Sequence, residues 1–96
     1  MVLGTVAGTV VTSQRADRID APSYLLIELC DQTGQRKKDF LVALDMIGAG
    51  PGEMVLICQG SAARQTQLTD NCPMDAIIVG IIDVIDERGK VVYQKS

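Results

Sequence analysis

The chain has 96 residues, which is enough for one domain and too few for two. Its net charge is −3 and only three residues are aromatic, which excludes a surface built on phosphate contacts and base stacking, so no nucleic-acid partner is expected. It contains no histidine, so the commonest general base and the commonest zinc ligand are both missing. Hydrophobic residues make up 47% of the chain, a surplus that favours burial of apolar surface between copies.

The N-terminal residues have neither the basic nor the apolar region of a signal peptide, and no segment approaches the roughly 20 apolar residues that span a bilayer. No membrane partner is therefore expected. The cysteines at positions 30, 58 and 72 lack the spacing of a metal site or of a redox pair. Cys30 and Cys58 fall in apolar runs, where thiols act as small buried hydrophobes. This usage predicts a reduced, cytoplasmic protein.

The first expected element is a long strand over residues 2–12, which are rich in valine and threonine. A regular strand places Gly4 and Gly8 on one face, a spacing typical of a strongly coiled barrel strand or of a second chain passing close by. Neither face of this strand carries a charge, which predicts that both faces are covered. The polar residues 14–23 are expected to form a loop.

The remaining elements are also strands. They are expected at residues 24–30, 38–44, 53–59 and 76–85, followed by a short edge strand at 91–94. Turns are expected at 31–34, where Gly34 can adopt a positive φ, and at 86–90. Ser61 is placed to cap a short helical turn over residues 62–65. The pattern predicts an all-β protein, a small closed or nearly closed barrel of five or six strands with one short helix.

The segment Gly48-Ala49-Gly50-Pro51-Gly52 has the glycine content of a phosphate-binding turn but neither its spacing nor its context. A dinucleotide fingerprint needs G-x-G-x-x-G between a strand and a helix, and a P-loop needs Gly-Lys-Ser/Thr. Two interpretations remain open, an ordinary barrel turn and a turn at a crowded subunit contact. At Gly50 a left-handed φ or a close contact is expected, so that valine there would disrupt folding or assembly.

No pair of carboxylates suggests acid–base chemistry, and without histidine no Ser-His or Cys-His pair can form. We therefore expect no catalytic residues, no metal site and no enzyme activity.

Three segments are more informative: 8–14 (GTVVTSQ), 48–64 (GAGPGEMVLICQGSAAR) and 73–85 (PMDAIIVGIIDVI). In order and content they resemble the signature segments of the EutN/CcmL family, the vertex proteins of bacterial microcompartment shells, over nearly the whole chain.

The resemblance implies one vertex domain over residues 1–96, an OB-like barrel and assembly as a cyclic homo-pentamer without cofactors. Such pentamers cap the vertices of a shell whose facets are tiled by hexameric shell proteins, in the cytoplasm. It also implies a place near subunit contacts or the central pore for six residues: Gly48, Gly50, Gly52, Ser61, Ala62 and Arg64. A catabolic metabolosome (ethanolamine, propanediol or glycyl-radical type) is the expected compartment. The alternative is an OB-fold-like binding module for nucleic acid or a small ligand.

Overall fold

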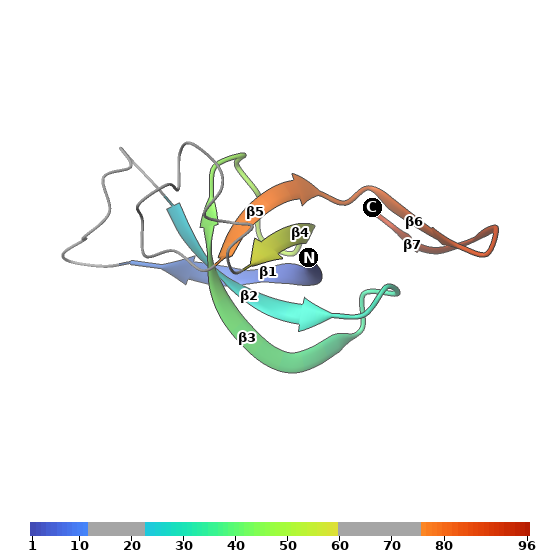
Figure 1. Ribbon diagram of the computed structural model, residues 1–96, viewed down its shortest axis with the longest axis horizontal. Coiled ribbons are helices and arrows are strands. Elements are labelled where there is room, and N and C mark those ends of the chain that lie inside the picture. The colour runs from blue at the N-terminus through green and yellow to red at the C-terminus, as the bar shows by residue number, and fades with distance from the viewer. Residues whose placement is uncertain (12–22, 60–75) are drawn as a thin grey trace.

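The computed structural model describes residues 1–11, 23–59 and 76–96, and the helical turn expected at 62–65 lies outside them. Five strands close a barrel in the order β1-β2-β3-β5-β4, and two more form a separate two-stranded sheet (Figure 1). The prediction of an all-β barrel is confirmed. The strands are β1 Val2–Val10, β2 Ser23–Cys30, β3 Arg36–Asp45, β4 Met54–Gln59, β5 Ala76–Ile81, β6 Val84–Glu87 and β7 Lys90–Gln94.

The barrel is closed by one parallel and four antiparallel pairings. β3 and β5 run parallel, and every other neighbouring pair in the barrel is antiparallel. The interior is filled by alternate residues of each strand, as the two-residue period of a strand requires. Its fully buried side chains include Ile27, Ala43, Val55, Ile57 and Ile78. Branched aliphatic residues dominate this core, which is why these segments form strands.

A β-bulge in β1 changes the expected placement of its two glycines. The pairing with β2 shifts between Val6 and Gly8, so Gly4 lies opposite Leu29 whereas Gly8 lies opposite Leu26. Gly4 therefore faces the interior and Gly8 the exterior, and the expectation of a shared face is wrong because one extra residue reverses the alternation. A Cβ on Gly4 would overlap Ile27 Cγ2, whereas none of the described atoms lies within 4 Å of one on Gly8.

The turn between β2 and β3 is built on the Asp31 carboxylate. Its Oδ1 accepts hydrogen bonds from Thr33 Oγ1 at 2.6 Å, Thr33 N at 2.9 Å and Gln35 N at 3.0 Å. The Thr33 hydroxyl, followed by these two amides, lowers the pKa of Asp31. Gly34 has φ 92°, which confirms the glycine turn predicted here. The turn directs β3 back along β2 and leaves its tip beside the second sheet (Figure 1).

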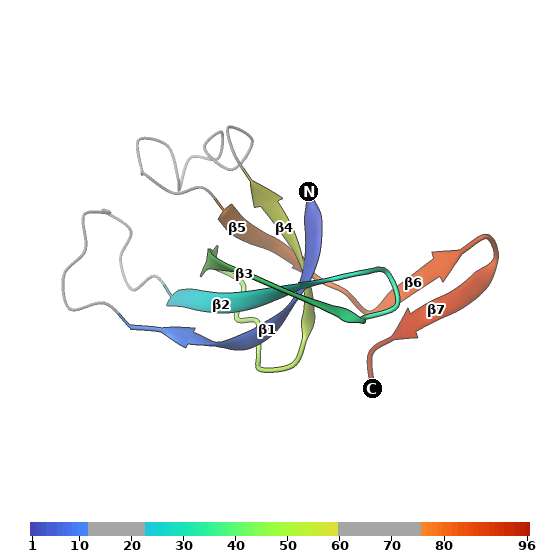
Figure 2. The same ribbon diagram turned by 90° about the horizontal axis from the view of Figure 1, so that it is seen from below.

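The strand expected at 76–85 is two strands, because the chain leaves the barrel at Ile82 and Asp83. β5 ends at Ile81, and β6 pairs with β7 rather than with the barrel, so the expected edge strand at 91–94 belongs to a separate hairpin. Arg88 and Gly89 join its strands with φ 56° and 83°, the left-handed pair of a type I′ turn. Figures 1 and 2 both show this hairpin, coloured orange to red, extending away from the barrel.

Candidate functional site

The glycine segment singled out in the sequence forms the loop between β3 and β4. Gly48 and Gly52 have φ 80° and 79°, so at these two positions the backbone takes the left-handed conformation that glycine adopts at least cost. Gly50 does not, so of the two alternatives expected there, a left-handed φ or a close contact, the first is absent. The close contact expected at Gly50 is present, because a Cβ would lie 3.2 Å from Glu53 Oε1.

Asp45, the last residue of β3, organises the first half of this loop. Its Oδ1 accepts hydrogen bonds from the amides of Ile47 and Gly48, both at 3.1 Å, and its Oδ2 accepts one from Ala49 at 3.0 Å. A carboxylate that accepts successive amides in this way fixes a turn that the backbone alone would not hold. The start of the loop is therefore set by one side chain.

Glu53 organises the second half and connects it to the C-terminus. Its Oε1 accepts a short hydrogen bond from the amide of Gly50, and its Oε2 lies 2.7 Å from Lys95 Nζ. The hydrogen bond with Lys95, and then that with Gly50, lowers the pKa of Glu53, while the same Glu53 contact raises the pKa of Lys95. Both directions favour the charged pair, so this contact ties the loop to the segment that follows β7.

The loop is also hydrogen-bonded to β1. Gly52 N donates to Val6 O at 2.9 Å, and Val6 N donates to Glu53 O at 3.0 Å. The amides of residues 47–50 and 52 thus all donate to acceptors of the same chain. A phosphate-binding loop needs amides that point freely at the anion. None of these five amides is free to bind an anion, which argues against a nucleotide site on this loop.

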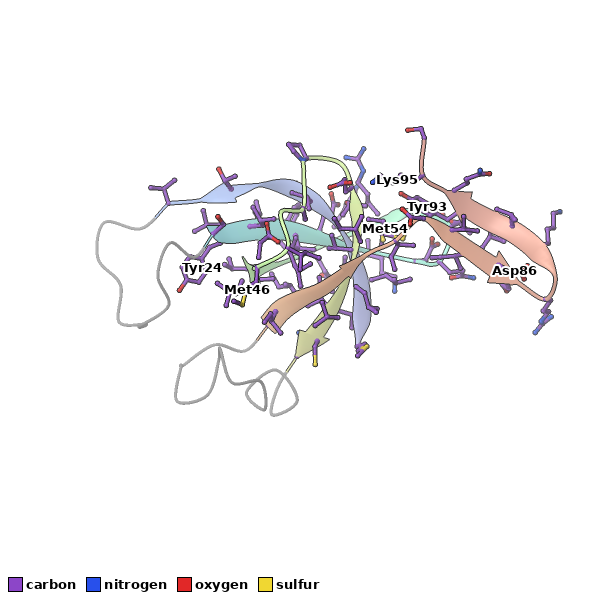
Figure 3. The ribbon with its side chains drawn as sticks, turned by 90° about the horizontal axis from the view of Figure 1, so that it is seen from above. Tyr24, Met46, Met54, Asp86, Tyr93 and Lys95 are labelled. Atoms are coloured by element: carbon purple, nitrogen blue, oxygen red, sulfur yellow. The ribbon has the colours of Figure 1, made fainter. Side chains whose placement is uncertain are left out.

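The hairpin of β6 and β7 is attached to the barrel beside the turn at 31–34. A Cβ on Gly34 would lie 3.3 Å from Tyr93 Cδ1 and 3.6 Å from Met54 Cε, so the Tyr93 ring covers Gly34. Gln32 Nε2 donates to Glu87 Oε1 at 2.8 Å. Figure 3 shows Tyr93, Lys95 and Met54 together at this junction, with Asp86 farther out along the hairpin. One face of the hairpin is thus fixed to the barrel.

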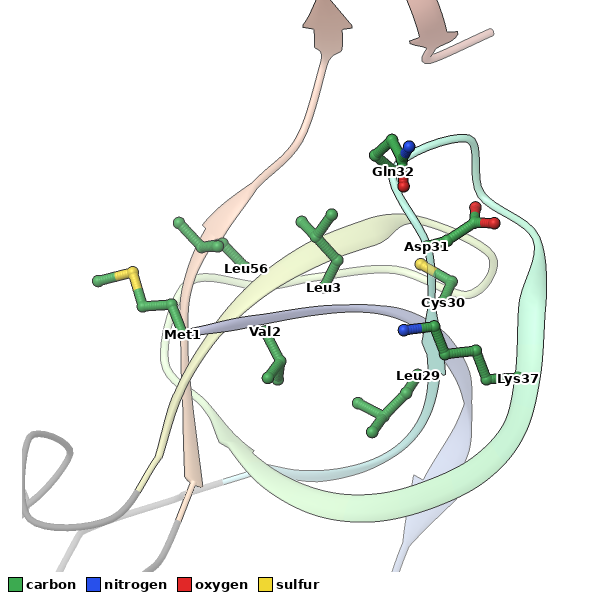
Figure 4. A pocket seen from close by; sticks show the side chains of 9 residues that line it. All are labelled: Met1, Val2, Leu3, Leu29, Cys30, Asp31, Gln32, Lys37 and Leu56. Carbon is green, nitrogen blue, oxygen red and sulfur yellow. The ribbon is translucent and has the colours of Figure 1, made fainter. Parts of the chain in front are cut away.

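A pocket of about 360 Å³ lies beside the N-terminus (Figure 4). Its apolar side is formed by Met1, Leu3 and Leu56, and Cys30 lies on the opposite side with Lys37. Burial raises the pKa of the Cys30 thiol, which keeps it protonated and poorly nucleophilic. Residues 1–11, 23–59 and 76–96 contain no group of three potential metal ligands, and no helix in them is long and apolar enough to cross a membrane.

The six residues expected near subunit contacts fall into two groups. Gly48, Gly50 and Gly52 lie together on the β3–β4 loop, with Gly48 and Gly52 exposed. Ser61, Ala62 and Arg64 lie outside the described residues. Sequence reasoning missed the two carboxylates that hold the loop and the anchoring contacts of Lys95 and Tyr93. The separation of 42 residues between Glu53 and Lys95 leaves no local pattern that could have revealed their contact. Asp45 is different, because it lies only two to four residues before the amides that it binds, and an Asp at the start of a glycine turn is a local signal for this role.

Comparison of the sequence with known protein families identifies the family of this chain. The sequence model of the family described as "Ethanolamine utilisation protein EutN/carboxysome" matches residues 1–83. The chain belongs to the EutN/CcmL family. The carboxysome shell vertex protein CcmL of Gloeobacter violaceus is 41% identical over 96 residues, covering 100% of this chain and 96% of that protein. The bacterial microcompartment shell vertex protein EutN of Salmonella typhimurium is 38% identical over 95 residues, covering 99% and 96%.

Solved structures of the EutN/CcmL family extend the likeness to the fold. The structure of Gloeobacter violaceus CcmL superimposes with a TM-score of 0.91 and covers 99% of this chain and 98% of its own. The GrpN pentameric microcompartment shell protein of Rhodospirillum rubrum has a TM-score of 0.80 at 32% identity, covering 91% and 99%. These relatives are named as shell proteins and none as an enzyme, in agreement with the prediction that the chain is not an enzyme.

Proposed function

We propose that this chain is a structural shell protein of a bacterial microcompartment and that five copies form a ring at each vertex of the shell. Membership of the EutN/CcmL family, together with likeness to a pentameric shell protein over nearly the whole chain, supports this most directly. The five-fold unit introduces curvature where it meets a flat layer of hexameric shell proteins, which are the second partner. Residues 1–96 act as one domain, in the bacterial cytoplasm.

The chemistry of the described residues is consistent with a building block. The glycine loop has its amides occupied and its two carboxylates paired with donors, so it presents a fixed shape rather than a reactive group. We propose that Gly48, Gly50 and Gly52, with Ser61, Ala62 and Arg64, lie at the subunit contact or at the central opening. A loop without side chains at alternate positions lets a neighbouring backbone approach closely.

Native mass spectrometry of the purified chain tests the ring. The expected species has five times the mass of the 10.3 kDa chain and persists on dilution to low micromolar concentration. A protein that stays monomeric at high micromolar concentration would refute the proposal. Co-expression with hexameric shell proteins tests the vertex role. Closed polyhedral shells are expected with this chain and open sheets or tubes without it, and shells that close equally well in its absence would count against that role.

The compartment that we propose is a catabolic metabolosome of the ethanolamine, propanediol or glycyl-radical type. Overall similarity does not separate the two kinds of relative, since identity is 41% to a carboxysome protein and 38% to EutN. The genes beside the coding sequence test the assignment. Genes for aldehyde-producing catabolic enzymes are expected, and genes for carbon-fixing enzymes would overturn the metabolosome proposal while leaving the vertex role intact.

A further inference from the structure

The pocket beside the N-terminus lies at one end of the barrel, where β1 begins and β2 ends (Figure 4). Leu3 pairs with Leu56 of β4, and Gly4 pairs with Leu29 of β2, so leucines from three strands meet in the wall of the pocket. All three leucines are only half-buried. The pocket therefore presents an apolar wall that is held in place by hydrogen-bonded strands.

A lysine side chain brings positive charge into this pocket. In Figure 4 the ammonium group of Lys37 points inward beside Cys30, whereas the carboxylate of Asp31 points away. Burial, and then the charge of Asp31, raises the pKa of the Cys30 thiol, and Lys37 partly opposes that shift. This opposition agrees with an ammonium group close to the sulfur. The positive charge therefore lies inside the pocket and the negative charge at its rim.

The ammonium group of Lys37 is available to a ligand. Within residues 1–11, 23–59 and 76–96, no hydrogen bond and no ion pair involves this side chain. The polar groups beside it are occupied, because Asp31 Oδ1 accepts the hydrogen bonds of its own turn and Gln32 Nε2 donates to Glu87 Oε1. Among the described residues that line the pocket, Lys37 is thus the charged group that can bind a ligand.

We propose that this pocket binds a small carboxylate with an apolar chain. The Lys37 ammonium group binds the carboxylate, and the wall of Leu3, Leu29 and Leu56 covers the chain. An apolar lining with a few placed polar groups is the usual composition of a small-molecule site, and about 360 Å³ is near the lower limit of size for such sites. A chain of a few carbons therefore fits better than a larger molecule.

The charges around the pocket favour a carboxylate over a phosphate. One ammonium group balances the single charge of a carboxylate but not the nearly double charge of a phosphate group. The excess negative charge of a phosphate would also be repelled by Asp31 at the rim. This binding site goes beyond the proposed shell role, which requires no ligand.

Leucine methyl NMR of the assembled wild-type protein tests where a carboxylate binds. On titration with hexanoate, the methyl signals of Leu3, Leu29 and Leu56 are expected to shift with one common dissociation constant. Leu25 and Leu44 are buried and do not line the pocket, so their signals are expected to stay in place. Pocket leucines that do not shift, or equal shifts of all five residues, would overturn the proposal.

Three related probes in the same titration test what the pocket recognises. Hexanoate is expected to bind at least about fourfold more tightly than butanoate, which is the factor for one further buried methylene group. Hexanol has the same chain without the charge and is expected to bind about fivefold more weakly than hexanoate, the upper range for an exposed ion pair. Hexylamine is expected not to bind, because Lys37 repels it. The proposal fails if butanoate, hexanol or hexylamine binds as tightly as hexanoate.

Two lysine variants form a matched pair, because Lys37 and Lys38 are exposed neighbours and only Lys37 lines the pocket. Lys37→Met is expected to bind hexanoate about fivefold more weakly and to lose the preference over hexanol. Lys38→Met is expected to bind like the wild type. Leu56→Thr keeps the ammonium group and is expected to bind hexanoate and butanoate equally. A preference for hexanoate over hexanol that survives in Lys37→Met, or that is lost in Lys38→Met, would contradict the site.

Native mass spectrometry of the same samples separates this proposal from the shell role. A wild-type chain that is monomeric and still binds hexanoate in this way would refute the ring and leave the site intact. A five-chain species whose pocket leucines do not respond to hexanoate would overturn the site and leave the ring intact.

Discussion

Alanine at Gly4 and alanine at Gly8 are expected to have opposite effects on stability, although the two glycines lie in the same strand. At Gly4 the new methyl group would overlap Ile27 Cγ2 and lie 3.1 Å from the Glu28 carbonyl oxygen and 3.4 Å from Ile57 Cδ1. Ile27 and Ile57 are fully buried and have no free space to move into. Overpacking of this kind costs about 1–3 kcal/mol.

At Gly8 the same methyl group meets none of the described atoms within 4 Å, and φ is not left-handed. Alanine there is expected to stabilise the chain by about 0.4–1 kcal/mol, because it restricts the unfolded state without straining the folded one. The two variants should therefore differ by at least about 1.4 kcal/mol, which corresponds to at least about 6 °C in melting temperature for a domain of this size.

Far-UV circular dichroism at one fixed protein concentration measures both effects, since assembly makes the melting temperature concentration-dependent. The order expected is Gly8→Ala above wild type and wild type above Gly4→Ala. If the two variants melted together, or if Gly4→Ala were the more stable, the bulge at residue 7 would not separate the two glycines, and the account of β1 given above would be wrong.

Three further changes test the core, the loop and the ion pair. Ile57→Ala is expected to lower the free energy of unfolding by about 2–5 kcal/mol in denaturant titrations, because it leaves a cavity at a fully buried position. A loss below about 1 kcal/mol would mean that the surrounding side chains move in and fill the cavity. Asp45→Ala is expected to lower the free energy of unfolding by about 1.5–3 kcal/mol, because three amides lose a charged acceptor. Asp45→Asn keeps one oxygen acceptor and should recover part of this loss. If both variants lose the same free energy of unfolding, the carboxylate does not hold the loop. Lys95→Met removes the ion pair with Glu53. Folding lowers the pKa of Glu53 and raises that of Lys95, so the wild type should melt at a higher temperature than Lys95→Met between the unfolded pKa values of the two groups, about 4.3 for Glu and 10.4 for Lys. This difference in melting temperature should be lost as the pH falls through the folded pKa of Glu53, and as it rises through the folded pKa of Lys95. A difference that does not vary with pH would contradict the pair.

The sequence carried enough information to predict the strands but not their connections. Alternating valine, isoleucine and leucine marked each strand of the barrel, and Asp31 and Gly34 marked a turn, because these signals are local. The run at 76–85 was predicted as one strand because Ile82 to Ile85 keeps a high apolar content. Only the pairing of β6 with β7 shows that the chain turns out of the barrel there.

The faces of the strands were harder to predict than the strands themselves. A single bulge residue in β1 moves Gly8 to the face of the strand opposite to that of Gly4. The bulge between Ile85 and Asp86 brings Val91 to the same face of the hairpin as Val84. Bulges have no clear sequence signature, so every residue beyond one is assigned to the wrong face by a strict alternation. The contacts of Lys95 with Glu53 and of Tyr93 with Gly34 join distant segments, which no periodicity reveals.

The occupied amides of the β3–β4 loop have a consequence for the energetics of association. A loop that orders only when a neighbour arrives subtracts the entropy of that ordering from the binding free energy. Here Asp45, Glu53 and Val6 already fix the backbone of the isolated chain, so little conformational freedom remains to be lost. At the proposed subunit contact this loop should therefore add no cost of a disorder-to-order transition to the free energy of association.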